Sequence, residues 1–147
     1  MAIEYADTII VTLDSLRKVQ RAQRVTYDSG IVSPNESKLI EALGPVASIL
    51  GLVFIKSTPA GLAAGVISLF STMLLPSDKS ILKAQVYEGY WQLGYMIDFM
   101  EDNPKYDKIE ILLPFIEYTV NSGPLRFITG RGVIKKAHTS AGWIVLE

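Results

Sequence analysis

The chain has 147 residues, of which 49% are apolar and 20% are charged, and its formal net charge is −1. This length fits one domain with its own core, and the near-neutral charge gives no general attraction to nucleic acid. The lack of cysteine excludes disulfides, thiolate chemistry and cysteine-ligated zinc, and the single histidine, His138, excludes a metal site built from several histidines.

The first predicted element is a helix over residues 7–24, which Asp7 can cap. Its apolar residues recur at helical spacing, and its end carries four basic residues, Arg17, Lys18, Arg21 and Arg24. Spacings of three and four place most of these cations on one face. They either form a solvated helix end or contact an anionic surface of lipid head groups, with nucleic acid the weaker option.

A turn at residues 28–30 is followed by two predicted helices, over 38–55 and 60–75, with Asn35 and Ser37 as candidate caps for the first. We call this pair the apolar helical hairpin, because residues 44–76 contain one charged residue, Lys56, which lies at its tip. Helices that are apolar on every face belong in a protein core or a bilayer.

Two explanations of the apolar helical hairpin remain open. Each arm of about 17 residues spans roughly 25 Å, less than the ~30 Å hydrocarbon core of a bilayer, but this small chain offers few elements to cover two such helices. Lipid or other subunits would then complete the burial. The spacing of Gly61 and Gly65 permits close helix approach, and with Leu69, Phe70 and Lys56 these residues form the predicted membrane or self-association face.

The fourth predicted helix covers residues 79–102, and Gly89 and Gly94 weaken it by about 1 kcal/mol each. Four aromatic residues form a belt on this helix: Tyr87, Tyr90, Trp91 and Tyr95. We expect the belt to pack in the core against the apolar helical hairpin. The alternative is an anchor at a membrane surface.

After Pro104 the apolar period changes from helical to alternating, which predicts an antiparallel meander from about residue 106 onward. Ile109, Ile111 and Leu113 would face one way, and Pro114 would mark a bulge or an edge strand. A turn over residues 140–142 would separate the last two strands. His138 lies near a strand end, where a surface position is expected.

The segment from Gly61 to about Leu93, with Leu69, Leu74, Pro76 and Ile81 at matching positions, resembles the start of the helical pore-forming domain of bacterial delta-endotoxins. The resemblance covers about residues 60–95 and implies membrane insertion by helices. The apolar helical hairpin is also similar in pattern to that of colicin-type pore formers. The chain departs from the toxins in its short length and in its terminal meander.

The sequence therefore predicts an α+β fold: a helical region over 1–104 with the apolar helical hairpin at 38–75, and a meander over 105–147, packed as one domain. We expect no enzyme, catalytic residue, metal or cofactor. The leading hypothesis is a toxin-like, membrane-associating or membrane-perturbing protein. The alternative is a structural subunit of a virion or secreted complex, with the apolar helical hairpin buried between protomers.

The expected partners are membrane lipid or copies of the chain itself, as a homo-oligomer, rather than nucleic acid. Acidic Glu4 and Asp7 lie where a signal peptide would carry its basic residues, so no cleavable signal peptide is expected. The compartment stays open between membrane association, non-classical secretion and a particle.

Overall fold

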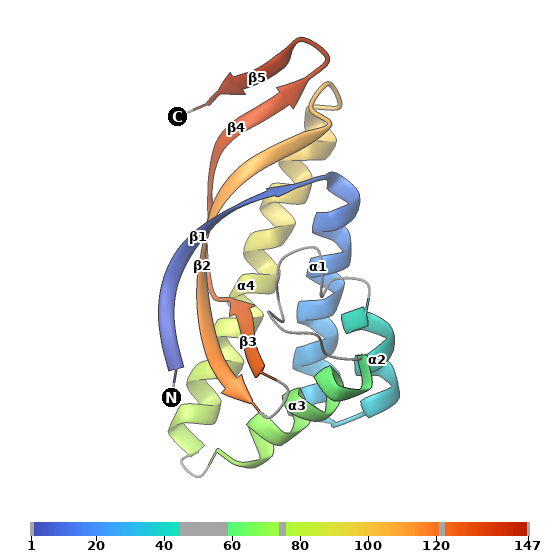
Figure 1. The fold of residues 1–147 in the computed structure, drawn as a ribbon, viewed down its shortest axis with the longest axis vertical. Helices are drawn as coiled ribbons and strands as arrows, with labels where there is room; N and C mark the ends of the chain where they lie inside the picture. Colours follow the sequence, from blue (N-terminus) through green and yellow to red (C-terminus); the bar gives the residue numbers. More distant parts are fainter. Residues whose placement is uncertain (1, 45–58, 74–75, 121–122, 147) are drawn as a thin grey trace.

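The computed structural model describes residues 2–44, 59–73, 76–120 and 123–146, in which an antiparallel five-stranded sheet packs against helices (Figure 1). The α+β class and the antiparallel sheet are confirmed. The elements are β1 (Ala2–Val11), α1 (Leu13–Thr26), the π-helix η1 (Tyr27–Val32), α2 (Glu36–Leu43), α3 (Pro59–Ser71), α4 (Pro76–Asp102), β2 (Lys108–Val120), β3 (Gly123–Ile128), β4 (Val133–Thr139) and β5 (Gly142–Val145).

The long strand β2 organises the sheet. β1 pairs along one side of it, from Val11 opposite Ile109 to Ala2 opposite Tyr118. On the other side, β4 pairs with the first part of β2 and β3 with the last part, and β5 pairs only with β4. In Figure 1, α1 and α4 run side by side in opposite directions behind the sheet, and the β4–β5 hairpin lies at the end farthest from α3.

The prediction of a helix over 7–24 is wrong at its start. Residues 2–11 form β1, and α1 begins at Leu13 behind Thr12, whose hydroxyl oxygen accepts from the Ser15 backbone N–H at 3.1 Å. Asp7 is therefore not a cap. Because β1 belongs to the sheet, the division into a helical region over 1–104 and a sheet over 105–147 is also wrong at the N-terminal end.

α3 and α4 follow the predictions for 60–75 and 79–102 with shifted boundaries, and α2 covers the first residues of the helix predicted over 38–55. Of the two candidate caps, Asn35 caps α2, because its side chain accepts a hydrogen bond from the Lys38 N–H at 3.1 Å, whereas Ser37 lies within the helix. The predicted turn at 28–30 is instead part of η1, where a Cβ on Gly30 would meet Val66 of α3 at 2.9 Å. Residues 45–58, which include Lys56 and most of the first arm of the apolar helical hairpin, lie outside the described residues.

In the sheet, Ile109, Ile111 and Leu113 are buried together as predicted. Pro114 lies between the part of β2 that pairs with β4 and the part that pairs with β3, and its carbonyl accepts from the Thr129 N–H at 3.1 Å. The edge-strand alternative for Pro114 is wrong because β2 is paired on both sides. The irregularity in register falls between Glu110 and Ile111.

A buried amide joins α1, α4 and β3. The Gln23 amide nitrogen donates to the carbonyls of Val86 (3.0 Å) and Ile128 (3.1 Å), and its oxygen accepts from the Ile128 N–H (3.0 Å). Gly89 of α4 allows this approach, since a Cβ there would lie 2.0 Å from the Ile128 carbonyl oxygen. The glycine that weakens the isolated helix is what lets α4 pack against β3.

Candidate interaction surface

The four basic residues of α1 each have a carboxylate partner. The ion pairs are Arg17–Glu101 (2.9 Å), Lys18–Asp14 (2.9 Å), Arg21–Glu41 (3.0 Å) and Arg24–Asp28 (3.6 Å). All of these side chains are exposed, so each pair contributes only about 0–1 kcal/mol to stability. Their main effect is to leave this face of α1 close to neutral, which weakens its attraction for anionic head groups.

The predicted association face of α3 is divided between core and surface. Gly65 and Phe70 are buried, and the Phe70 ring lies 6.3 Å from that of Phe127 in β3. Gly61 and Leu69 are half-buried. The residues of α3 that face outward are small or polar, among them Ala60, Ala64, Ser68 and Ser71. The described part of α3 thus gives its large apolar side chains to the core of its own chain.

Among the described helices, none combines the length and the apolar character that a membrane span requires.

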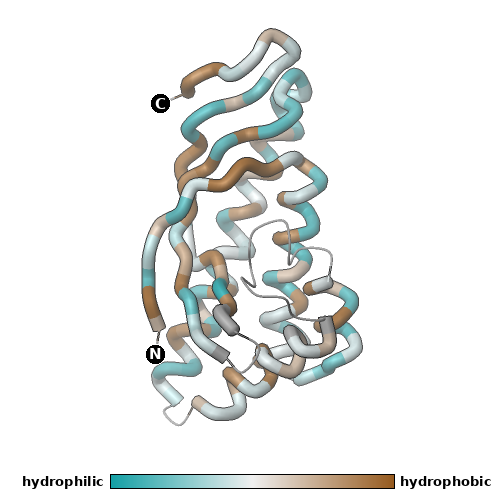
Figure 2. The backbone as a smooth tube through the Cα atoms, in the orientation of Figure 1, coloured by the Kyte–Doolittle hydropathy of each residue, from teal (hydrophilic) through white to brown (hydrophobic). Residues whose placement is uncertain are grey.

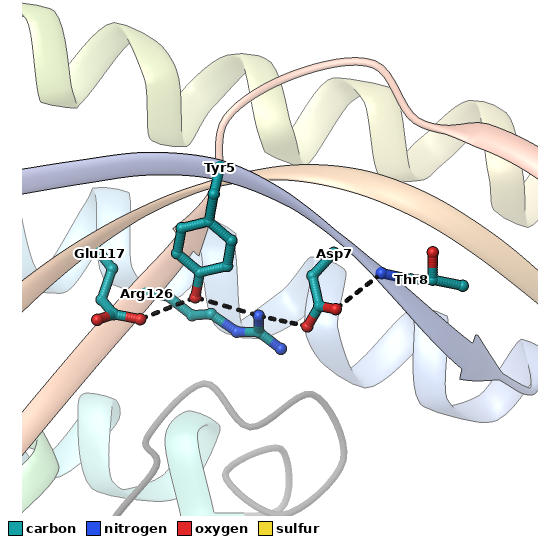
Figure 3. A network of polar contacts seen from close by, with 5 residues as sticks. All are labelled: Tyr5, Asp7, Thr8, Glu117 and Arg126. Atoms are coloured by element: carbon teal, nitrogen blue, oxygen red, sulfur yellow. Dashed lines mark hydrogen bonds and ion pairs between the residues drawn. The ribbon is translucent and has the colours of Figure 1, made fainter.

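A polar network joins β1 to β3 across β2 (Figure 3). The Arg126 side chain, only 4% exposed, donates to Asp7 at 2.9 Å and to the Tyr5 hydroxyl at 3.3 Å, and its guanidinium lies 3.8 Å from the Phe115 ring centroid. Tyr5 in turn donates to Glu117 at 2.8 Å. Burial, followed by this hydrogen bond, raises the pKa of the Tyr5 hydroxyl, so the phenol stays protonated at neutral pH.

The network therefore has the features of a structural tie between strands rather than of a proton-transfer site. Within the residues that the structure describes, no group of three acidic or histidine side chains is arranged to hold a metal ion.

The aromatic belt lies on the surface, which corrects the expectation that it packs in the core. Tyr87, Trp91 and Tyr95, one helical turn apart, are 45%, 51% and 64% exposed. We call these three residues the aromatic stripe. The half-buried Tyr90 packs against it, with its ring 5.9 Å from that of Trp91. Tyr27 of η1 extends it, with its ring 5.3 Å from that of Tyr87.

An apolar groove lies beside the aromatic stripe, between α4 and the start of β4. We call it the α4 groove, and its volume is about 660 Å³. Tyr95, Met96 and Phe99 form one wall, and Gly132, Val133 and Ile134 form the other. Arg131 is the one charged residue among those that line it. Gln92, which is uncharged, donates a hydrogen bond from its amide nitrogen to the Glu88 carboxylate at 2.7 Å. Such a groove suits an apolar occupant.

A second exposed apolar region is the β4–β5 hairpin. Trp143, Ile144, Val145 and Leu146 are all exposed, at an end of the molecule where Figure 2 shows apolar residues next to the C-terminus. His138 lies at the surface as expected, half-buried, with its Nδ1 2.7 Å from Asp107 and its ring 5.1 Å from that of Trp143. The hydrogen bond from His138 lowers the pKa of the Asp107 carboxyl.

The sequence predicted the aromatic belt and the last strand, but not that residues 131–134 form the wall of a groove or that the apolar side chains of β5 are exposed. The sequence does contain a signal that β5 lacks a polar face: Trp143 to Leu146 are four successive apolar residues with no polar alternation. A strand without a polar face needs cover on both faces. No comparable signal marks Tyr27, which reaches the aromatic stripe only because η1 continues α1.

Comparison of the chain with protein-family models, with curated proteins and with solved structures found no match. The resemblance to delta-endotoxins therefore stays a prediction. The functional argument depends on the surface just described.

Proposed function

We propose that the protein is a non-enzymatic assembly subunit, which associates with other protein chains, and first of all with copies of itself, through the aromatic stripe. The observation that carries this proposal is the exposure of Tyr87, Trp91 and Tyr95 in one line beside the α4 groove. Three large aromatic side chains in contact with water are unfavourable in an isolated chain, and burial against a partner would recover that free energy.

The composition of this surface supports a protein partner. Tyrosine, tryptophan and arginine supply most of the binding free energy at protein–protein interfaces. The aromatic stripe is bordered by such residues on both sides: a hollow of about 310 Å³ is lined by Arg24, Tyr27 and Trp91, and the α4 groove contains Arg131. An interface here would have aromatic anchors and a polar rim.

Two observations favour assembly over the membrane hypothesis. Val66 and Phe70 of α3 are buried in the core, and the half-buried Ile67 and Leu69 pack against it, so the described part of the apolar helical hairpin would have to leave the core to reach lipid. In addition, the cations of α1 are paired with carboxylates, which reduces their attraction for an anionic bilayer. Relative to the sequence-based hypotheses, the proposed contact moves from the apolar helical hairpin to α4.

The test is sedimentation velocity of the wild type from low micromolar to near-millimolar concentration, with Trp91→Ala beside it. We expect concentration-dependent self-association, weakened about tenfold or more by the loss of an anchoring aromatic side chain. Ile81→Ala is the matched control, because Ile81 is an exposed apolar residue of the same helix outside the aromatic stripe. Equal association of Trp91→Ala and wild type would contradict the proposal.

Flotation with anionic liposomes tests the rival function. A wild type that stays monomeric in solution but floats with lipid would replace assembly by membrane association. Loss of flotation in Trp91→Ala would then assign the lipid contact to the aromatic stripe.

A further inference from the structure

The β4–β5 hairpin leaves apolar side chains uncovered on both sides. β5 pairs with β4 alone. Along β5 and the residue after it, Trp143 and Val145 alternate with Ile144 and Leu146, so the exposed side chains point to both faces of the sheet. Residues 142–146 contain no charged residue and no proline, the residue types that protect edge strands from pairing with other chains. Burial of this strand requires a partner surface that is itself apolar.

The α4 groove is the complementary surface on the same chain. It is hollow and lined mainly by apolar side chains, whereas the β4–β5 hairpin projects from the body of the molecule. The two surfaces also adjoin each other: the Leu146 N–H donates to the Lys135 carbonyl at 2.9 Å, one residue from Ile134 in the wall of the groove. The groove wall and the apolar end of the β4–β5 hairpin are therefore neighbours on the same sheet.

Charge complements shape. From Ala84 to Asp102, α4 contains four carboxylates and no lysine or arginine. Of these, Glu101 pairs with Arg17, whereas Glu88, Asp98 and Asp102 form no ion pair with a described residue. From Val133 to Leu146 the chain contains two lysines, at 135 and 136, and no carboxylate. The carboxylates of α4 and the two lysines of the β4–β5 hairpin are opposite in sign, which suits association of the two elements, and Arg131 is the one charged residue in the lining of the groove itself.

We infer that two copies of this chain associate by placing the β4–β5 hairpin of each in the α4 groove of the other. The inference rests on the proposed assembly function and names its partner and geometry. Because the groove and the hairpin adjoin on β4, both contacts can form at once around a two-fold axis, and the association closes as a dimer. Trp143 and Val145 of one copy would then lie against Tyr95 and Met96 of the other.

The experiment uses two variants of the full chain, each damaging one half of the contact: Tyr95→Asp in the α4 groove and Val145→Asp in β5. Each alone should be monomeric under conditions where the wild type is a dimer, because both contacts of a homodimer are then broken. An equimolar mixture should form a heterodimer, since the intact hairpin of one chain meets the intact groove of the other. The remaining contact in that heterodimer brings two aspartates together and stays open.

Val32→Asp is the matched control, because Val32 is an exposed valine of η1, far from β4 in the sequence and outside the α4 groove. It should leave the dimer intact. Circular dichroism checks that each variant is folded. A dimer that survives Val145→Asp, a mixture that stays monomeric, or a wild type that forms larger assemblies would overturn the reciprocal dimer without affecting the proposed assembly function. A dimer that survives Tyr95→Asp would overturn the reciprocal dimer and would also count against association through the aromatic stripe, to which Tyr95 belongs. A wild type that stays monomeric at near-millimolar concentration would overturn both.

Discussion

Two regions of the molecule differ in how completely their polar and apolar groups are covered: the contact between α1 and α4, and the β4–β5 hairpin. At the first, Gln23 is buried with all its hydrogen bonds made to backbone atoms, and Gly89 allows α4 and β3 to touch. At the second, the strand β5 is held by one neighbouring strand and by exposed side-chain contacts around Trp143. The first region is complete within one chain, and the second lacks cover until a partner supplies it.

The largest expected effect is that of Gly89→Ala. The new Cβ would meet backbone atoms of Ile128 at 2.0 and 2.7 Å and the Gln23 amide nitrogen at 2.8 Å. The backbone of β3 cannot move aside as the end of a flexible side chain can, so α4 and β3 must separate. The hydrogen bonds from Gln23 to Val86 and Ile128 weaken as a result. We expect a loss of about 3 kcal/mol or more in the free energy of unfolding, measured by urea denaturation.

Gly94→Ala is the control for this substitution in the same helix. A Cβ at Gly94 would meet only the Gln20 amide nitrogen, at 3.2 Å, which is the end of a flexible side chain. The higher helix propensity of alanine, about 1 kcal/mol, offsets that contact. We expect stability within about 1 kcal/mol of wild type. Equal losses in the two alanine variants would mean that helix propensity, and not the approach to β3, decides both.

Gln23→Met should have the next largest effect, because it keeps the length of the side chain and removes all three hydrogen bonds. The Ile128 N–H and the carbonyls of Val86 and Ile128 would then be buried with fewer partners. We expect a loss of about 2–3 kcal/mol in the free energy of unfolding. A melting temperature equal to that of wild type would show that the amide can be replaced by apolar packing.

The next expected effect is smaller than those of the substitutions and concerns the wild type, in which the free energy of local opening should differ between the two regions. Two hydrogen-bonded amides report on it: Ile128 N–H, bonded to Gln23, and Leu146 N–H, bonded to the Lys135 carbonyl. At a concentration low enough for monomer, native-state hydrogen exchange should give Leu146 an opening free energy at least about 2 kcal/mol below that of Ile128. Equal protection would place the β4–β5 hairpin in the same cooperative unit as the body.

The sequence predicted the elements whose signals are local. The Asn35 cap, the stop before Asn103-Pro104 and the alternation of Ile109, Ile111 and Leu113 each act within a few residues, and the structure has α2, α4 and β2 there. It failed at β1, because Ile9 and Ile10 continue the helical spacing of α1 although the run Thr8 to Val11 is β-branched. Residues 2–11 form a strand because they pair with β2, which lies more than 95 residues away in the sequence.

The candidate site was predicted in its residues but not in its location. The aromatic belt was recognised, but whether it faces the core or the solvent depends on which side of α4 meets α1. Gln20, Gln23 and Gly89 set that side, and neither of these glutamines differs in the sequence from an ordinary polar surface residue. Likewise, a volume such as the α4 groove depends on how β4 lies against a helix that ends more than 30 residues earlier in the chain.

The smallest expected effect lies at the base of the β4–β5 hairpin, at Asp107. The hydrogen bond from His138 keeps the pKa of this exposed carboxyl below its ordinary value of 3.8. A carboxyl whose pKa is lowered by folding stabilises the fold at pH values above its unfolded pKa, and this contribution disappears as the pH falls through the lower folded pKa. Asp107→Asn should therefore flatten the dependence of stability on pH only at that acid end.

Carbon-13 NMR of the Asp107 carboxyl measures the cause directly. Its titration midpoint should lie below 3.8 in the wild type and return toward 3.8 in His138→Gln, while the backbone hydrogen bond from the Asp107 N–H to the residue 138 carbonyl is kept. Exchange at Leu146 should quicken in that variant, and exchange at Ile128 should not change, since Gln23 and not His138 holds it. A midpoint that does not move would assign the lowered pKa to other charges. A change at Ile128 as well would mean that the hairpin and the body respond as one.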